Sequence, residues 1–352
     1  MSDQIAKMLR VITATRGDIC TCCSKQDVEE VEQTIAVIMA LLQDVWVEQM
    51  IRAYDDVLLY LERATQGLAP NAVAEVEARR ILGQYALDDR LSRTALGLQM
   101  VDYVLRLIRR GADTALQGAS ERAVEAAGER LLLDGALAVA GSLSFSHEPV
   151  DVLLRPAAVE DLRQMLRGHS TLREGEIRKL VGAYLDDPRL RSTHVVVEPG
   201  SAQERSLLTG PPTSREAFRA QLERAVGVDT AVWLNATVDA WAYRWFNVGR
   251  YRTLRQQGIT VIYAQAVLDE RTTPFCRWVD GRRINIAKAD SQLRRYVHAT
   301  TSGDDAEMRR VWPLLTRKEI QAEPEDFSRM FSKVGLPPYH FRCRTIPVTS
   351  HQ

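Results

Sequence analysis

The chain has 352 residues, of which 45% are hydrophobic and 26% charged, and its 46 basic and 46 acidic side chains cancel. This composition excludes a disordered chain, and the length suggests about two domains of ordinary size. The longest apolar stretches fall well short of the roughly 20 residues that a membrane-spanning helix needs, and polar residues interrupt the N-terminal segment where a signal peptide would carry its apolar core.

The N-terminal segment carries three of the five cysteines, at Cys20, Cys22 and Cys23. These thiolates could bind a metal, but no fourth ligand lies close by in the sequence, so free thiols near a terminus are the favoured interpretation. An odd number of cysteines fits a reducing compartment better than a disulfide framework. We therefore expect the protein to be made in, and to stay in, the cytosol of its host cell.

Apolar residues recur at helical spacing from residue 25 to about residue 140. The pattern predicts three long helical stretches, over 25–67, 71–111 and 120–141. Each would bury one apolar stripe, and the simplest arrangement is an antiparallel bundle. The fold predicted for residues 1–150 is therefore mainly α, a helical bundle.

The segment 151–212 has the pattern of a helical and turn-rich connector. A helix is expected after Pro156, a short helix within 173–185, and a short strand at 194–198. Gly, Ser and Pro residues cluster after that strand, which is typical of a link between folded parts. This cluster predicts a domain boundary near residues 200–212.

The remaining segment, 213–352, mixes helices with a strand. The predicted elements are a helix beginning at residue 213 or 214, a long helix over 229–258, a strand within 259–268, and helices at 288–298 and 305–315. We therefore predict an α+β domain with a small sheet. The long helix carries an aromatic run from Trp233 to Tyr251, which could stack on nucleic-acid bases but at helical spacing is more typical of a core or an interface.

The charge of the C-terminal part is uneven although the whole chain is neutral. Residues 271–352 hold 15 Lys and Arg against 9 Asp and Glu, a net charge of +6. Such a segment could face nucleic acid or an acidic protein partner. A mixed-charge surface explains the same count equally well, since no long basic run is present.

Two short stretches of this part contain residue types that bind metals or act as nucleophiles. The first, 267–282, holds Cys276, and the second, 337–345, holds His340 and Cys343. Zinc prefers thiolate and imidazole ligands, and the spacing His-x-x-Cys is a workable half of a zinc site. The second half of such a site would then have to come from the region of Cys276.

Three interpretations of this group remain open. In a zinc site with the usual four ligands, the fourth would have to be Asp280, His298, His351 or water. Alternatively, the cysteines are small buried apolar side chains and the histidine is a hydrogen-bonded turn residue. A Cys–His nucleophilic pair is the third possibility, but it needs an oxyanion site and an orienting group that the sequence does not supply.

Polar residues around Cys276 also predict tight turns. Asp269 follows the predicted strand, where its carboxylate can accept backbone N–H bonds in an Asx-type turn. Arg271 can pair with this carboxylate or with another one. The dipeptide Asp280–Gly281 is a turn signal, typical of a hairpin. We expect these residues to form a compact set of turns where the two stretches meet.

The first stretch contains LDERTTPFC, followed after three residues by DG, and the second begins PPYHFRCR about sixty residues later. This combination resembles the phage head-morphogenesis family, the minor capsid proteins of the phage Mu protein F type. The residues that match the family's pattern are Asp269, Arg271, Thr272, Cys276, Asp280, Gly281, Pro337, Pro338, His340, Cys343 and Arg344. The resemblance covers about residues 213–349 and implies that 213–352 is a head-morphogenesis domain. Many members also carry Arg-Thr-Glu early in the long helix, where this chain has LNATVDAW at residues 234–241.

The resemblance implies a structural role without catalysis. Such proteins enter the phage procapsid in few copies, associate with the portal vertex, and assist head assembly and DNA packaging or ejection. The expected partners are therefore the portal protein, other capsid or scaffold proteins, and packaged double-stranded DNA, which would be bound non-specifically. The expected location is the host cytoplasm during assembly and then the virion. The helices of residues 1–150 would offer amphipathic faces to a portal or scaffold partner.

Two other functions are weighed against this one. Domains of this family are sometimes fused to effectors such as ADP-ribosyltransferases and nucleases, but residues 1–200 lack Gly-rich phosphate loops and clustered His and carboxylate residues. A DNA-binding protein would be non-specific, because no helix-turn-helix, zinc-finger or RNA-binding signature is present.

These interpretations lead to a geometric prediction. The region of Cys276 and the turn that holds His340 and Cys343 should be neighbours in space. Sulfur atoms more than about 10 Å apart would exclude a shared zinc ion, whose bonds to sulfur are about 2.3 Å long.

Overall fold

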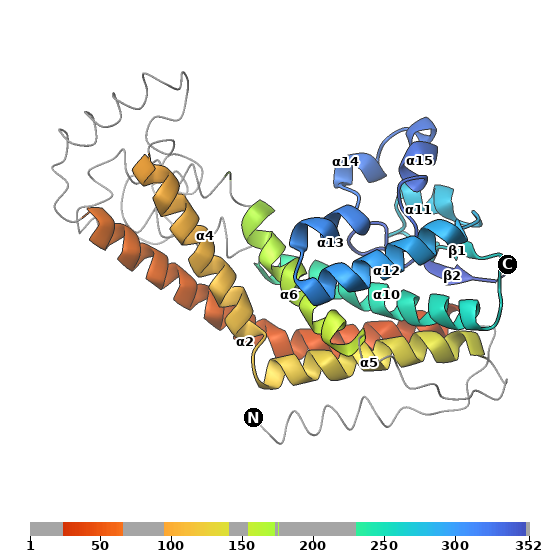
Figure 1. The fold of residues 1–352 in the computed structure, drawn as a ribbon, viewed down its shortest axis with the longest axis horizontal. Coiled ribbons are helices and arrows are strands. Elements are labelled where there is room, and N and C mark those ends of the chain that lie inside the picture. Colours follow the sequence, from red (N-terminus) through yellow and green to blue (C-terminus); the bar gives the residue numbers. More distant parts are fainter. Residues whose placement is uncertain (1–23, 66–94, 141–153, 173–174, 176–229, 350–352) are drawn as a thin grey trace. The chain divides into compact units, whose positions relative to one another are not determined.

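The computed structural model describes residues 24–65, 95–140, 154–172, 175 and 230–349. These residues are mostly helical, with a two-stranded antiparallel sheet near the C-terminus, which confirms the predicted fold class (Figure 1). The helices are α2 (Ser24–Thr65), α4 (Ala95–Ala115), α5 (Ala119–Ala140), α6 (Leu154–Leu172), α10 (Thr230–Gln256), α11 (Pro274–Val279), α12 (Ile286–Ser302), α13 (Asp305–Val311), α14 (Arg317–Ile320) and α15 (Pro324–Phe331). The strands are β1 (Tyr263–Gln265) and β2 (Ile346–Val348). Among the described helices, none is both long enough and apolar enough to cross a membrane.

The described residues form two compact units. The first unit combines residues 24–42, 117–140, 154–165 and 234–349. The second combines residues 43–65, 95–116, 166–172, 175 and 230–233. The division into 1–150, 151–212 and 213–352 stays a prediction, and most of its middle segment lies outside the described residues.

In the second unit, α2 and α4 bury apolar side chains at helical spacing. The buried positions include Trp46, Ala53 and Val57 on α2, and Val101, Val104, Leu105, Ile108 and Ala112 on α4. An ion pair between Arg167 and Asp113 joins α6 to α4 within this unit. The apolar residues that recur at helical spacing in the sequence are therefore the ones that these helices bury.

The first unit is built around α10, whose aromatic side chains are buried. The rings that are at most 1% exposed are those of Trp241, Tyr243, Trp245, Phe246 and Tyr251. Trp241 also donates from Nε1 to the backbone carbonyl of Ala158 on α6 at 2.8 Å. From Trp241 to Tyr251 the aromatic run is therefore part of the core, because a stacking platform for bases would need exposed ring faces.

A buried ion pair joins three helices of the first unit. Arg244 on α10 donates to Asp161 on α6 at 2.7 Å, and the two side chains are 3% and 0% exposed. Trp245 and the hydroxyl of Tyr296 on α12 donate to the same carboxylate. Since removal of one partner from a buried pair costs about 3–5 kcal/mol, this network fixes the positions of α6 and α12 on α10.

The backbones of α5 and α10 come into contact at two glycines. A Cβ built on Gly135 would lie 2.0 Å from the carbonyl oxygen of Phe246, and one on Gly249 would lie 2.1 Å from that of Leu132. No side chain can be placed at either position unless a helix moves. The contact therefore sets the spacing between α5 and α10.

The small sheet forms after α10 ends. Gly258 has a φ of 75°, a value that suits the glycine at the end of a helix. The chain then enters β1, where Tyr263 lies opposite Val348 of β2 and Gln265 lies opposite Ile346. The sheet thereby brings the last described residues back to the segment that leads to Cys276.

The ends of several elements differ from those predicted. The strand expected within 259–268 is limited to β1, because β2 pairs with only three of its residues. The helix expected after Pro156 begins at Leu154. The N–H groups of a first helical turn have no intrahelical partner, so a proline is tolerated there. The helices expected at 288–298 and 305–315 are α12 and α13.

Three short helices, α11, α14 and α15, were not predicted. In α14 the Thr316 hydroxyl accepts from the Glu319 N–H while the Glu319 carboxylate accepts from the Thr316 N–H, a capping box. Helices of one or two turns show too little periodicity to be detected, so capping residues are their main sequence signal. The helices expected over 71–94, 173–185 and 213–229, and the strand at 194–198, fall mainly outside the described residues.

The glycine contact between α5 and α10 leads to the first prediction. Gly249→Ala should lower the free energy of unfolding by about 1–3 kcal/mol, because the added methyl group collides with backbone that cannot rotate away. Thermal unfolding followed by circular dichroism measures the change. The matched control is Gly168→Ala, since Gly168 lies in α6 and a Cβ added there would meet nothing within 4 Å. That variant should be neutral or stabilised by up to about 1 kcal/mol, and equal melting of Gly249→Ala and wild type would contradict the prediction.

Candidate metal centre

Cys276 lies in the short helix α11, which begins directly after Thr273. The Thr273 hydroxyl accepts a hydrogen bond from the Cys276 backbone N–H at 3.2 Å. Pro274 occupies the first turn, where its missing N–H leaves no intrahelical bond unmade. These two residues start the helix, and Cys276 is buried at 4% exposure.

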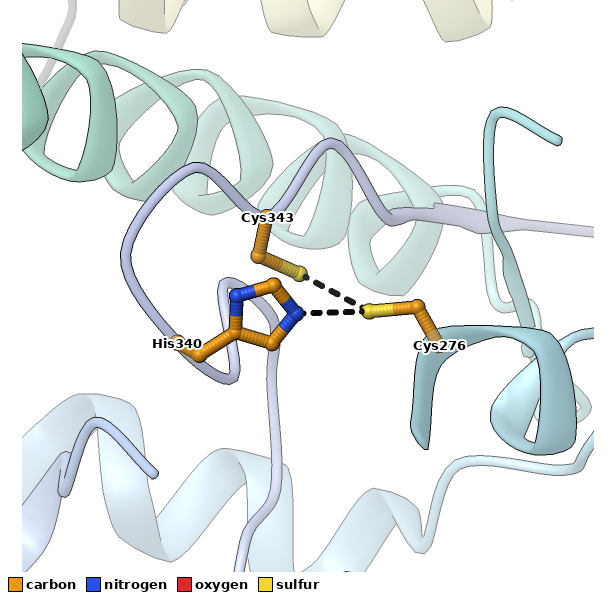
Figure 2. A group of neighbouring side chains, drawn as sticks. All are labelled: Cys276, His340 and Cys343. Carbon is orange, nitrogen blue, oxygen red and sulfur yellow. Dashed lines mark hydrogen bonds between the residues drawn. The ribbon is translucent and has the colours of Figure 1, made fainter. Parts of the chain in front are cut away.

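His340 and Cys343 lie in the loop between α15 and β2. A cis peptide bond joins Pro337 to Pro338 before the histidine. The chain then turns at Arg342, whose φ is 61°, and the Cys343 N–H donates to the His340 carbonyl at 3.2 Å. The turn brings the histidine and the cysteine to the same side of the loop (Figure 2).

Asn247 on α10 holds this loop on both sides of His340 and Cys343. Its Nδ2 donates to the carbonyl oxygens of Pro337 at 3.2 Å and Thr345 at 3.0 Å. Arg250, almost one turn further along α10, donates from Nε to the carbonyl oxygen of Pro347 at 3.1 Å. Since buried carbonyls need hydrogen-bond partners, these side chains replace the regular backbone pairing that the loop lacks.

The side chains of Cys276, His340 and Cys343 point toward one another (Figure 2). The Cys276 sulfur lies 3.0 Å from His340 Nε2 and 3.6 Å from the Cys343 sulfur. All three donor atoms lie within 4.8 Å of one another, and all three residues are buried. The predicted proximity of the two stretches is therefore confirmed.

The imidazole of His340 is oriented by its other nitrogen. Its Nδ1 lies 2.6 Å from the carbonyl oxygen of Phe341 and must donate to it, because a carbonyl only accepts. In the neutral ring Nε2 then carries a lone pair directed toward Cys276. A backbone carbonyl that fixes the tautomer in this way is the usual second partner of a metal-ligating histidine.

The spacing of the donor atoms fits a tetrahedral ion. Two sulfurs bound to zinc at 2.3 Å would be about 3.8 Å apart, and the sulfurs of Cys276 and Cys343 are 3.6 Å apart. The residues present therefore suit zinc or another ion that prefers thiolate and imidazole ligands. The burial of Cys276 disfavours the nucleophile interpretation, because a substrate needs access to the attacking sulfur.

The surroundings of the two thiols affect their pKa values differently. The hydrogen bond to Cys343, together with burial, raises the pKa of the Cys276 thiol well above its usual value. Burial by itself would raise the pKa of Cys343 too, but the hydrogen bond from Cys276, and the positive charge of His340 when its ring is protonated, lower it well below its usual value. The shared hydrogen bond therefore shifts the pKa values of the two thiols in opposite directions, and thiolate character is favoured at Cys343.

Asp269 and Arg344 form an ionic contact beside the buried group. Arg344 donates to Asp269 Oδ2, and the backbone N–H of Arg271 donates to Oδ1 at 2.9 Å in the predicted Asx-type turn. The Thr272 hydroxyl donates to the carbonyl of Val267 at 2.6 Å. Asp269 therefore links the two motif stretches through side-chain and backbone bonds.

The predicted turn at Asp280–Gly281 is present, with a φ of 74° at Gly281. It joins α11 to a segment that runs beside β1, so it does not connect two strands as in a simple hairpin. The N–H of Gly281 donates to the carbonyl of Ala264 at 2.8 Å, and Asp280 Oδ1 accepts from the N–H of Ala266 at 2.8 Å.

Of the fourth ligands considered from the sequence, no described residue joins the group. Asp280 is engaged by Ala266, and His298 is exposed on α12. His351 lies outside the described residues, as does the segment with three N-terminal cysteines. The group within the described residues consists of three donor residues.

Several residues that build the site were missed in the sequence. Thr273 lies 3.1 Å from His340 Nε2, and Thr345 donates to the Cys276 sulfur at 3.5 Å. Asp239 on α10 has a buried Oδ2 with no hydrogen-bond partner. Burial, followed by the nearby negative charge of Cys343, raises the pKa of Asp239 to about 6. A threonine before proline is a weak capping signal that could have pointed to Thr273, whereas nothing local distinguishes Asp239.

Comparison of the chain with models of protein families, with curated proteins and with solved structures finds no match.

The contact between Asp269 and Arg344 leads to the second prediction. The hydrogen bond from Arg344 lowers the pKa of Asp269 to about 2. A depressed carboxyl pKa stabilises the fold above the unfolded value near 3.9, and that contribution disappears as the pH falls toward 2. In Arg344→Gln the pKa of Asp269 should rise toward 3.9, as measured by an NMR titration of the carboxyl carbon.

The control for this titration is Arg277→Gln. Arg277 also lies next to Asp269, but it donates to the backbone carbonyl at 2.7 Å and not to the carboxylate. The pKa of Asp269 should therefore change less in this variant. A carboxyl that still titrates near pH 2 in Arg344→Gln would contradict the assigned cause.

Proposed function

We propose that this chain is a minor capsid, head-morphogenesis protein of a tailed phage or a phage-derived particle. In this proposal it associates with the portal vertex, assists head assembly and DNA packaging or ejection, and catalyses no reaction. The observation that supports it most is the meeting of two sequence stretches in one buried centre. Those stretches, around Cys276 and around His340 and Cys343, are the two halves of the pattern that resembles the family.

We further propose that the centre binds zinc in a structural role. Cys276, His340 and Cys343 would bind the ion. The ion would thereby hold the segment of Cys276 against the loop of His340 and Cys343. A bound zinc ion would supply bonds between parts of the chain that lie 64 and 67 residues apart. Structural zinc sites contribute directly to folding stability in this way.

The character of the centre favours a docking role over turnover. The donor atoms are buried, whereas Asp269 next to them is exposed at the surface, where it pairs with the nearly buried Arg344. Such an arrangement stabilises a shape and presents polar groups to a partner without giving a substrate access to the thiols. The partners in this proposal are the portal protein, other capsid or scaffold proteins, and packaged DNA bound through its phosphates.

The third prediction concerns the metal itself. Protein purified without chelator should contain about one zinc ion per chain, and Cys343→Ser should lose it, because removal of a thiolate leaves two strong ligands. Elemental analysis by mass spectrometry measures the metal. A chelator should lower the melting temperature of the wild type but not that of the variant, by about 2–4 °C for each kcal/mol lost.

The control is Cys22→Ser, which removes a thiol from the N-terminal cysteine group. Its zinc content should equal that of the wild type if the ion is held by the three buried residues. Zinc that disappears from Cys22→Ser and stays in Cys343→Ser would place the metal elsewhere and refute the assignment.

The fourth prediction concerns assembly. When the chain is produced together with the portal, scaffold and shell proteins of its own genome, it should be found in the purified particles in few copies. The combined variant His340→Ala with Cys343→Ser should be incorporated less, because the ion would no longer join the loop before β2 to the segment of Cys276. Quantitative mass spectrometry of the particles measures the copies.

Ser328→Ala, on the exposed face of α15, is the matched control and should be incorporated as the wild type is. Absence of the wild-type chain from particles that contain the portal would contradict the proposed function. Equal incorporation of the combined variant would show that the centre is not needed for docking.

A further inference from the structure

The two cysteines of the buried centre lie close enough to be joined by a covalent bond. Cys276 and Cys343 are both free thiols, and their sulfur atoms are 3.6 Å apart (Figure 2). A disulfide bond holds two sulfurs about 2.05 Å apart, so the gap to be closed is about 1.5 Å. Rotation of the two side chains toward each other can close a gap of this size. The arrangement that suits a metal ion therefore also suits a bond between the sulfurs.

A disulfide and a metal ion compete for the same two sulfurs. The thiolate is the form of cysteine that binds a metal, and a sulfur in a disulfide has no negative charge to donate. Oxidation would leave His340 as the remaining donor of the group. Because a single imidazole cannot replace two thiolates as zinc ligands, the ion would be released. The two sulfurs can thus be linked by the ion or by the bond, but not by both.

Either link joins the same two segments of the chain. Cys276 lies in α11 and Cys343 lies 67 residues later, in the loop before β2. Asn247 binds this loop at Pro337 and Thr345 through hydrogen bonds that involve neither sulfur. The loop therefore stays next to α11 while one link replaces the other. A cross-link between distant residues restricts the unfolded chain, so the disulfide should stabilise the metal-free fold.

We propose that Cys276 and Cys343 form a reversible redox pair, whose oxidation to a disulfide releases the metal ion of the centre. The disulfide rests on the distance between the sulfurs, whereas the release of an ion rests on the proposed metal site. In the proposed function, the chain passes from the reducing cytosol of the host into a particle outside the cell, where disulfides persist. The bond would there replace the ion and keep the two segments joined.

Hydrogen peroxide is the oxidant that we name, because a small molecule is needed to reach side chains that are 4% and 1% exposed. One sulfur attacks a peroxide oxygen, so that an S–O bond forms, the O–O bond breaks and the first thiol proton leaves in water. The second sulfur attacks the resulting sulfenic acid, so that the S–S bond forms, the S–O bond breaks and a second water leaves. The thiols lose two protons and two electrons, and the peroxide is reduced to water.

The test oxidises the folded, full-length, zinc-loaded protein with hydrogen peroxide. Replacement of Cys20, Cys22 and Cys23 by serine leaves Cys276 and Cys343 of the five cysteines. The thiols titrated in denaturant should fall from two per chain to none, and peptide mapping without reductant should find the two residues joined within one chain. The zinc released to a coloured chelator should equal the disulfide formed. Dithiothreitol should restore both the thiols and the metal binding.

Two variants and one melting experiment separate the disulfide from other effects of peroxide. His340→Gln keeps both cysteines and removes a metal ligand, so it should form the disulfide while it releases little zinc. Cys276→Ser has one thiol at the centre, which should become a sulfenic or sulfinic acid without an intramolecular bond. The oxidised protein should melt about 10 °C above the reduced, metal-free protein, because the cross-link restricts the unfolded chain.

Failure of the redox pair and failure of the metal site give different results. Thiols that persist, become sulfinic acids or join different chains overturn the redox pair, whether or not zinc is bound. An oxidised protein that melts below the reduced, metal-free form also overturns it, because the fold then does not accommodate the bond. A disulfide in a protein that never binds zinc supports the redox pair and refutes the metal site. Zinc that stays bound after the disulfide has formed refutes the competition between them.

Discussion

The amide of Asn247 is the contact on which the rest of the centre depends. The loop before β2 begins with two prolines, which have no N–H to pair, and its buried carbonyls need donors from elsewhere. The two N–H groups of this one amide reach the carbonyls of Pro337 and Thr345, so the loop is held at both ends while His340 and Cys343 lie between them. This one side chain thus helps to place two of the three metal-binding candidates.

The amide of Asn247 keeps its position because α10 is itself held by neighbouring helices. The buried pair of Arg244 and Asp161 ties α10 to α6 and α12, and the glycine contact ties it to α5. The polar groups of the centre then fall into two layers. The thiols and the imidazole are buried, and the pair of Asp269 and Arg344 lies beside them, with Asp269 exposed.

Sequence reasoning identified what is encoded locally or in a compact motif. The long helices follow from the spacing of apolar residues, and the burial of residues such as Val101 and Val104 repeats that spacing. The proximity of Cys276 to Cys343 was predicted because a recognisable pattern joins the two stretches. The roles of Asn247 and Asp161 could not be predicted, because each depends on a partner more than 80 positions away that only the packed fold brings close. The short β1 was overestimated for the same reason, since its length depends on β2.

The backbone contact between α5 and α10 has a mechanical consequence. With Gly135 and Gly249 each pressed against a carbonyl of the opposite helix, neither helix can slide along the other without driving a neighbouring side chain into the gap. Small shear displacements, the usual way in which packed helices yield, are therefore blocked at this point. A force exerted on the loop that Asn247 holds would therefore move α10 and α5 together, without displacing one helix along the other.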